Sequence, residues 1–370
     1  MKKQWKMWVL LSSTLALLTG CWDQKMLKDT IFMSAASYQI APDGRIDGAI
    51  AVHSYISNQE APVSKIYHAT ASSPRSGRVQ LNEQLSGTLM TAKNRVFLIE
   101  DDLAKKGIIQ LSDVLYRTPE SPLIARYVII DGKPNEIINM KQVGEELIGE
   151  YLSGVILTAE KQSLVPVETL QTICTLLFDE GKGLALPYAK FNKENMSVEI
   201  KGIALFNGEK FSGITLKDEE AKALLLLSNK KNKYMTMTDK VKMNGKEYIV
   251  SYDVAKAKSK LKIKVRSNHQ LEVKVPVSLK VSITEFTYGE VGSDDLIKKI
   301  ENTINKNVQN KAEKVVEKLQ KANCDFLEVG RELMAYHPDV WKELEWKKDY
   351  AQIDIKPDVT VEVIHRGIIN

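Results

Sequence analysis

The 370-residue sequence predicts an α+β fold of three domains and argues against a doubly wound parallel sheet. Within residues 30–205, short apolar runs alternate with segments of helical spacing, but the runs are unevenly placed. Within residues 248–283, apolar and polar side chains alternate over long stretches, as antiparallel strands with one buried face require. Residues 294–320 then carry apolar side chains at helical spacing. The C-terminal domain is therefore expected to be an antiparallel meander packed against a long helix.

The chain opens with a cationic and then an apolar segment. Lysines at positions 2, 3 and 6 precede Met7–Leu18, which has the length of a signal-peptide apolar region and is shorter than the ~20 residues of a membrane-spanning helix. The following Leu18-Thr19-Gly20-Cys21 resembles the lipobox of bacterial lipoproteins. An ordinary signal peptide with a chance cysteine is the alternative.

The lipobox resemblance implies that residues 1–20 are a signal peptide and that the thiol of Cys21 carries a diacylglyceryl group. Each buried CH2 of an acyl chain contributes about 0.8 kcal/mol, so two long chains hold a protein firmly to a membrane. The mature protein is thus expected to be a body tethered outside the cytoplasm, with membrane lipid as its partner through Cys21.

Composition and charge exclude some classes of partner and of structure. The formal charge of +5 includes the three signal lysines, and without them 49 basic residues (52 less 3) face 47 acidic ones, which argues against nucleic acid as a partner. After residue 20 no apolar run is long enough to span a membrane. Cys174 and Cys324 either pair or are two buried free thiols, and we favour free thiols.

The first domain, residues 21–125, is expected to begin with a β-hairpin whose turn is Pro42-Asp43-Gly44. The Ser-, Ala- and Pro-rich residues 57–77 are expected to form a loop. Arg95–Glu100 is a short apolar run typical of a buried strand. The middle domain, residues 126–195, contains a strand at Tyr127–Ile130 and is otherwise mostly helical.

The third domain, residues 196–370, has more regular patterns. Asn207-Gly208 predicts a hairpin, and a helix is expected over Asp218–Asn229. Ser293-Asp294 caps the long helix, and a second helical stretch runs over Asp325–Tyr336. Val359–Val363 supplies a closing strand.

The sequence has none of the common nucleotide-binding, zinc-protease or nucleophile motifs, and its five histidines have no metal-ligand spacing. No catalytic, cofactor-binding or metal residue is therefore nominated. The acidic run Glu100-Asp101-Asp102 is interpreted as a solvated helix start. Alternate lysines from Lys256 to Lys264 either face anionic lipid or keep an outer strand face soluble and unable to pair, and we favour the second interpretation.

Several motifs, in order along the mature chain, resemble the Ger(x)C family, the C subunits of the nutrient germinant receptors of bacterial spores. They are Cys21-Trp22-Asp23, Asn94–Gly107, Arg117-Thr118-Pro119-Glu120, Tyr127–Gly132, Lys201–Phe206, Phe211-Ser212-Gly213, Asp325-Phe326, Gly330, His337-Pro338, Trp341, Trp346, Val359–Val363 and Gly367. The chain departs from the family at Met26, where a glutamate is common, and at the start of Asn94–Glu100, where a histidine is common.

The resemblance implies a three-domain α+β lipoprotein without known enzymatic activity or cofactor. It implies a location on the outer face of the spore inner membrane, with a multi-spanning A subunit and a transporter-like B subunit as partners. Only Cys21 transfers as a functional residue, as the acylation site.

Two other classes of protein remain open. A solute-binding lipoprotein of a transporter predicts two lobes around a pocket and tight binding of a small molecule. A lipid-anchored hydrolase predicts a clustered nucleophile and base, which this sequence does not display.

Overall fold

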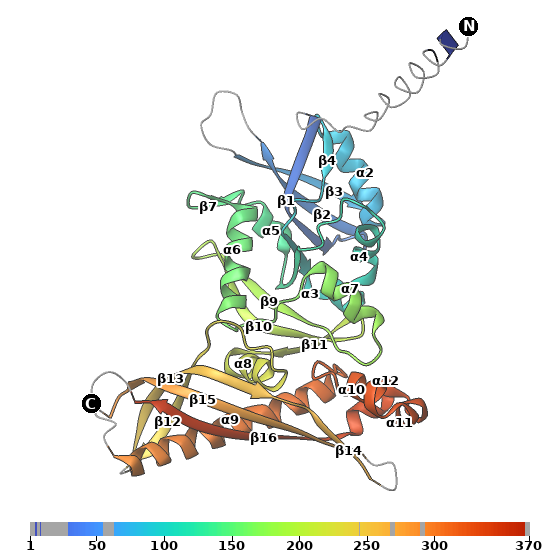
Figure 1. Ribbon diagram of the computed structural model, residues 1–370. Helices are drawn as coiled ribbons and strands as arrows, with labels where there is room; N and C mark the ends of the chain where they lie inside the picture. The colour runs from blue at the N-terminus through green and yellow to red at the C-terminus, as the bar shows by residue number, and fades with distance from the viewer. Residues whose placement is uncertain are drawn as a thin grey trace.

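The computed structural model describes residues 4–5, 8, 29–54, 63–243, 245–266, 271–288 and 293–366. Cys21 lies outside the described residues. An N-terminal body contains a nine-stranded mixed sheet, and a C-terminal body contains a five-stranded sheet with a long helix. The C-terminal body lies at the end of the molecule opposite the start of β1 (Figure 1).

The nine-stranded sheet has a parallel centre, covered by helices on both faces, and antiparallel ends, so the prediction against a doubly wound parallel sheet is wrong for its four central strands. The order is β11-β10-β9-β6-β5-β1-β2-β3, with β4 beside the start of β1. Strands β1, β5, β6 and β9 are parallel, while β2 and β3 at one end and β10 and β11 at the other are antiparallel to their neighbours. The strands are β1 (Thr30–Ile40), β2 (Ile46–Ser54), β3 (Val63–Ala71), β4 (Thr88–Met90), β5 (Val96–Glu100), β6 (Arg126–Asp131), β9 (Ala185–Asn192), β10 (Ser197–Asn207) and β11 (Lys210–Leu216).

Helices cover both faces of this sheet, which explains the continuous apolar run of β5. Phe97 and Ile99 pack with helices α2, α3, α4 and α7, whereas Val96 and Leu98 pack on the other face with α5 and α6. The helices are α2 (Pro74–Gln84), α3 (Asp101–Lys106), α4 (Ile109–Tyr116), α5 (Pro134–Ile138), α6 (Ile148–Lys161) and α7 (Leu170–Phe178). A separate two-stranded ribbon, β7 (Gln142–Val143) and β8 (Glu146–Leu147), precedes α6.

The structure confirms the hairpin of β1 and β2, the buried strand β5 and the Asn-Gly hairpin of β10 and β11. The loop prediction for residues 57–77 is wrong from Val63 onwards, because Val63–Ala71 forms β3 and α2 begins at Pro74. The Ser- and Ala-rich composition of this segment does not indicate a strand. The strand forms because β2 pairs with it in antiparallel fashion along its whole length. The division into domains 21–125, 126–195 and 196–370 stays a prediction; strand pairing continues across residues 125 and 195, from β5 to β6 and from β9 to β10.

The C-terminal body is the predicted sheet packed against a long helix. Antiparallel β12 (Thr236–Met243), β13 (Lys246–Ser259), β14 (Lys262–Val265) and β15 (Leu271–Phe286) are covered by α8 (Asp218–Leu227) and α9 (Asp294–Lys321). One strand differs from the predicted meander: β16 (Asp354–His365) runs parallel to β15. A parallel neighbour requires a long crossover, and α9, α10 (Val329–Tyr336), α11 (Pro338–Glu343), α12 (Trp346–Asp349) and η2 (Tyr350–Gln352) provide it.

Side chains of α9 occupy the free edge of β16. Gln309 donates to the carbonyl of Pro357 at 2.9 Å and accepts from the amide of Val359 at 3.0 Å. Glu301 accepts from the amide of Val363 at 2.7 Å. Three backbone groups of this edge that could pair with another chain are thereby satisfied within the molecule.

The two bodies meet at a close backbone contact. A Cβ on Gly181 would lie 2.7 Å from the amide nitrogen of Arg331, and a Cβ on Gly330 would lie 2.8 Å from the Cα of Gly181. The amide of Gly183 donates to the carbonyl of Asp325 at 2.7 Å. Larger residues at these glycines would push the two bodies apart.

Asp325 holds the start of α10 beneath this contact. Its buried carboxylate accepts hydrogen bonds from the amides of Val329 at 2.9 Å and Gly330 at 2.7 Å. Burial raises the pKa of Asp325 from 3.8 to about 7, although the two amides oppose the shift.

The raised pKa predicts a pH-dependent stability. Since the folded state binds this proton more tightly than the unfolded chain, the stabilisation is complete below about pH 4 and is lost as the pH rises through about 7. We expect Asp325 to lower the free energy of unfolding by about 2 kcal/mol between about pH 5 and pH 8. Urea denaturation of the wild type and Asp325→Asn across this range measures the difference. An identical pH slope in both proteins would contradict the assignment.

Candidate functional site

A crevice lies at the carboxyl ends of the parallel strands. After β5 the chain turns to α3, which packs on one face of the sheet, and after β6 it turns to α5, which packs on the other. Neighbouring parallel strands whose connections leave on opposite faces open a gap between them, where ligands of α/β sheets commonly bind. The crevice here has a volume of about 650 Å³. It is lined by Gln39, Ile40, Ala41, Pro42, Asp47, His68, Glu100, Asp102, Lys133, Asn135, Glu136 and Asn139.

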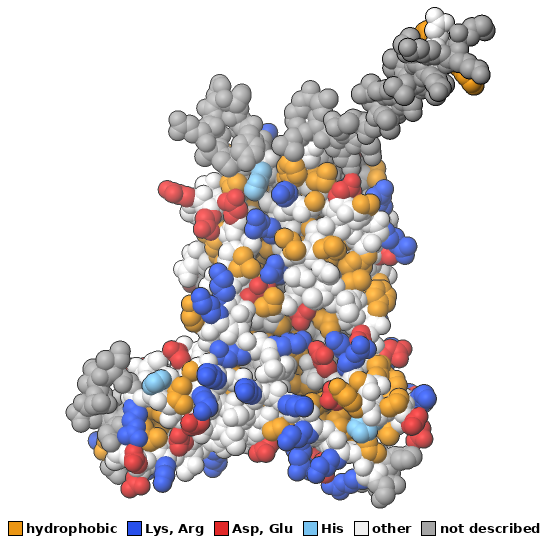
Figure 2. Space-filling model, viewed as in Figure 1, with side chains coloured by type: hydrophobic (Ala, Val, Ile, Leu, Met, Phe, Trp, Pro, Cys, Tyr) orange, Lys and Arg blue, Asp and Glu red, His pale blue; other side chains and the backbone are white. Residues whose placement is uncertain are grey.

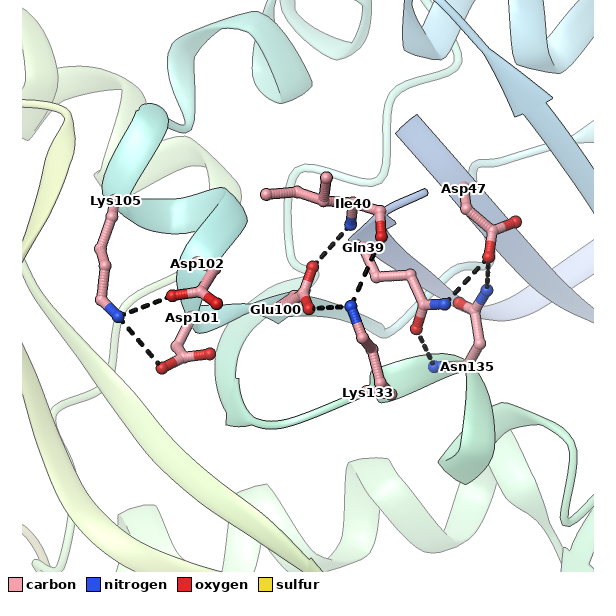
Figure 3. Close-up of polar contacts among 9 residues, drawn as sticks. All are labelled: Gln39, Ile40, Asp47, Glu100, Asp101, Asp102, Lys105, Lys133 and Asn135. Carbon is pink, nitrogen blue, oxygen red and sulfur yellow. Dashed lines mark hydrogen bonds and ion pairs between the residues drawn. The ribbon is translucent and has the colours of Figure 1, made fainter. Parts of the chain in front are cut away.

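An ion pair between a buried carboxylate and a half-exposed lysine forms one wall of the crevice. Glu100, at the end of β5, is 3% exposed and accepts a hydrogen bond from the amide of Ile40 at 2.6 Å. Lys133, which follows β6, pairs with the other carboxylate oxygen and also reaches the Ile40 carbonyl at 3.4 Å (Figure 3). The pair therefore ties the ends of β1, β5 and β6 together.

A second polar group surrounds Asp47 of β2. Its carboxylate accepts from the side chains of Gln39 at 2.9 Å, Asn135 at 2.8 Å and Thr70 at 3.3 Å. Asn135 is held in turn by the Ser37 hydroxyl, which donates to its side-chain oxygen at 2.7 Å. All three donors to Asp47 are neutral, and no Lys, Arg or His of the described residues forms an ion pair with it.

The remaining acidic side chains near the crevice have partners. Asp101 and Asp102 begin α3, as predicted, and both lie near Lys105, which pairs with Asp102 at 2.8 Å and lowers the pKa of that carboxyl. The same prediction is wrong for Glu100, which is buried. At the crevice rim, the ring of His68 lies 3.0 Å from the side-chain oxygen of Asn139.

Sequence reasoning missed Asp47, Lys133 and Asn135. The only local signals were an acidic residue within the strand Ile46–Ser54 and the Gly-Lys-Pro turn that follows a buried strand. Neither signal indicates that Asp47 lies beside Lys133 and Asn135 in the folded protein, since Asp47 and Asn135 are 88 positions apart in the sequence.

Of the alternate lysines from Lys256 to Lys264, Lys256 and Lys258 lie in the part of β13 beyond its pairing with β12, and Lys262 and Lys264 lie in the edge strand β14. Pairing with β12 ends at Asp253, and the five alternate lysines that follow are exposed and unpaired with any described acidic residue. Lys and Arg side chains are spread over the C-terminal body (Figure 2). This placement agrees with the interpretation that the lysines protect a free strand edge.

Of the three cysteines, the structure describes two. Cys21 lies outside the described residues, so its lipidation stays a prediction. Cys174 and Cys324 are free, with Cys324 buried and Cys174 partly buried. Within the described ranges, no three His, Cys, Asp or Glu side chains gather to hold a metal, and no helix has the length and hydropathy of a membrane span.

Comparisons with known proteins cover nearly the whole chain. The model described as spore germination protein N-terminal domain matches residues 23–191. The model described as spore germination B3/GerAC like, C-terminal, matches residues 201–367.

Individual relatives agree with the family models. The chain is 25% identical over 365 residues to spore germination protein GerQC of Bacillus cereus, covering 98% of this chain and 99% of the relative. It is 22% identical to spore germination protein KC of Bacillus subtilis strain 168, covering 95% and 94%. The crystal structure of the GerBC protein superposes with a TM-score of 0.53 at 15% identity over 89% of this chain and 96% of that one, a likeness of fold.

Proposed function

The chain belongs to the Ger(x)C family of spore germination proteins, and from this we propose that it is the lipid-anchored C subunit of a nutrient germinant receptor. The observation that carries the proposal is the extent of the match: two family models together span residues 23–191 and 201–367, and GerQC aligns with 98% of the chain. A shared segment alone would identify only a domain, whereas this match includes both bodies.

The anchor would be an acylated Cys21, which would place the protein on the outer face of the spore inner membrane. The nine residue steps from Cys21 to Thr30, the first residue of β1, reach at most about 30 Å. The N-terminal body would therefore stay close to the membrane, and the C-terminal body, at the opposite end of the molecule, would project away from it (Figure 1).

The role would be non-enzymatic and would depend on contacts with the membrane-spanning A and B subunits. A subunit transmits a signal only if its contacts differ in free energy between the resting and the activated receptor. The transporter alternative predicts a pocket between two lobes and tight binding of a small molecule. A cavity of about 540 Å³ does lie between the two bodies, lined by Glu168 and Leu176 on one side and by Lys230 and Glu328 on the other, so a test of small-molecule binding in this cavity of the isolated protein separates the two functions.

Replacing Cys21 tests the proposal directly. We expect Cys21→Ala to abolish incorporation of a radiolabelled fatty acid, to release the protein from the spore membrane fraction and to reduce nutrient-triggered germination, because a body without acyl chains has no anchor. Cys174→Ala, which changes another cysteine of the same chain, should leave all three unchanged. A wild type that carries no lipid, or a mutant that germinates normally, would contradict the proposal.

The same spores show whether the subunit supports assembly of the receptor or transmits the nutrient signal. If the subunit supports assembly, the amounts of A and B subunits in the spore membrane should fall together in the Cys21→Ala strain. If it transmits the signal, those amounts should be normal while the response falls. Immunoblots of the membrane fraction distinguish the two roles.

A further inference from the structure

We propose that the crevice at the ends of β1, β5 and β6 binds a small molecule that carries a protonated nitrogen, an ammonium or guanidinium group, with Asp47 as its counter-ion. This inference concerns a binding site and holds whether or not the chain acts in a receptor. It rests on three features of the described residues, which are the charge balance of the lining, the preorganisation of Asp47 and the size of the crevice.

One of the carboxylates that line the crevice has no cationic partner among the described residues. Four carboxylates line the crevice, from Asp47, Glu100, Asp102 and Glu136. Three of them have lysine partners: Glu100 pairs with Lys133, Asp102 with Lys105 and Glu136 with Lys193. Asp47 has only neutral donors among the described residues. An anionic ligand would meet this unmatched charge and be repelled, whereas a cation would neutralise it.

The carboxylate of Asp47 is already oriented by its neighbours before a ligand binds. The amides of Gln39 and Asn135 both donate to Oδ2, so the carboxylate is fixed in orientation by neighbours from β1 and α5 (Figure 3). Oδ1 accepts one hydrogen bond, from Thr70 at 3.3 Å, and retains a free lone pair. A donor that arrives at Oδ1 needs no rearrangement of these neighbours, which lowers the cost of binding.

The size and the walls of the crevice favour an organic cation over a metal ion. Its volume of about 650 Å³ lies within the range of small-molecule pockets. Ile40, Ala41 and Pro42 give it an apolar side, while His68 and Asn139 add polar groups at the rim. The described carboxylates do not converge as a set of metal ligands. A short alkyl chain with one ammonium group matches both kinds of wall.

The test uses the full chain in detergent micelles and n-butylammonium as the probe, with n-butanol and butyrate as neutral and anionic controls. Ligand-observed NMR titration should show saturable binding of butylammonium and none of the controls. Asp47→Asn should weaken that binding about tenfold. Asp43→Asn removes the same charge from an exposed aspartate four positions away, paired with Arg45 outside the crevice, and should change the affinity less than twofold.

A second variant changes a residue that makes no hydrogen bond to Asp47, so it still tests the proposal if Asp47→Asn folds poorly. Asn139 is exposed at the rim, so Asn139→Lys should fold normally and place a tethered ammonium group in competition with the probe. We expect it to weaken butylammonium binding at least fivefold, because the added charge competes with the probe for Asp47. Absence of saturable binding to the wild type, or equal weakening by Asp47→Asn and Asp43→Asn, would overturn the proposal.

Discussion

Gly202→Ala is expected to destabilise the protein by about 4 kcal/mol or more, and to disrupt the end of the nine-stranded sheet. Gly202 lies at a bulge between β10 and β9 and has a φ of +130°. A Cβ there would lie 1.9 Å from the carbonyl oxygen of Leu216 in β11. The variant therefore combines a strained backbone with an overlap that only separation of β10 from β11 can relieve.

Gly208→Ala is the matched control for this prediction. Gly208 also has a positive φ, +57°, but a Cβ there would meet no atom within 4 Å. Gly208→Ala should lower the free energy of unfolding by about 1 kcal/mol, because it adds only the strain of the left-handed conformation. Urea denaturation of the full chain, followed by circular dichroism, measures both variants. Equal losses would show that the contact with Leu216 contributes nothing.

Lys133→Met is expected to lower the free energy of unfolding by about 3 kcal/mol, because it leaves the carboxylate of Glu100 without its cation. Glu100 is 3% exposed, and among the described residues its one other hydrogen-bond partner is the amide of Ile40. Although Lys133 itself is half exposed, its removal leaves the buried carboxylate of Glu100 without a counter-ion, and this penalty exceeds the net attraction of the intact pair. Chemical denaturation near neutral pH measures the loss.

Two further variants separate this effect from a general loss of a lysine. Adding Glu100→Gln to Lys133→Met should restore most of the stability, since a neutral amide needs no counter-ion and still accepts from Ile40. Lys190→Met, in β9, breaks the exposed pair with Asp131 at the end of β6, 3.2 Å away, and should lower the free energy of unfolding by less than about 1 kcal/mol. A double variant as unstable as Lys133→Met would refute the explanation.

Local periodicity was sufficient for many individual elements. The apolar run of β5 marks a strand that is covered on both faces, and the alternation in β13 and β15 marks strands with one buried face. The long helix predicted over residues 294–320 forms as Asp294–Lys321, with Ser293 accepting from the amide of Leu296 as its N-cap. These features depend on neighbours within a few residues, so the sequence displays them directly.

The candidate site was not visible in the sequence because it is made by pairing between distant strands. Glu100 was assigned to a solvated helix start, since nothing in its own segment shows that Ile40 and Lys133 enclose it. Asp47 had no motif around it, and its neighbours Gln39, Thr70 and Asn135 come from three other elements.

The sequence by itself therefore determined the α+β class, the elements with strong periodicity and the family. Only the tertiary structure decided the parallel direction of β16, the sheet that joins β5 to β6 and β9 to β10, and the crevice with its unmatched carboxylate. The physical reason is that periodicity shows which face of a segment is buried, while strand direction and polar partners are fixed by contacts between segments far apart in the chain.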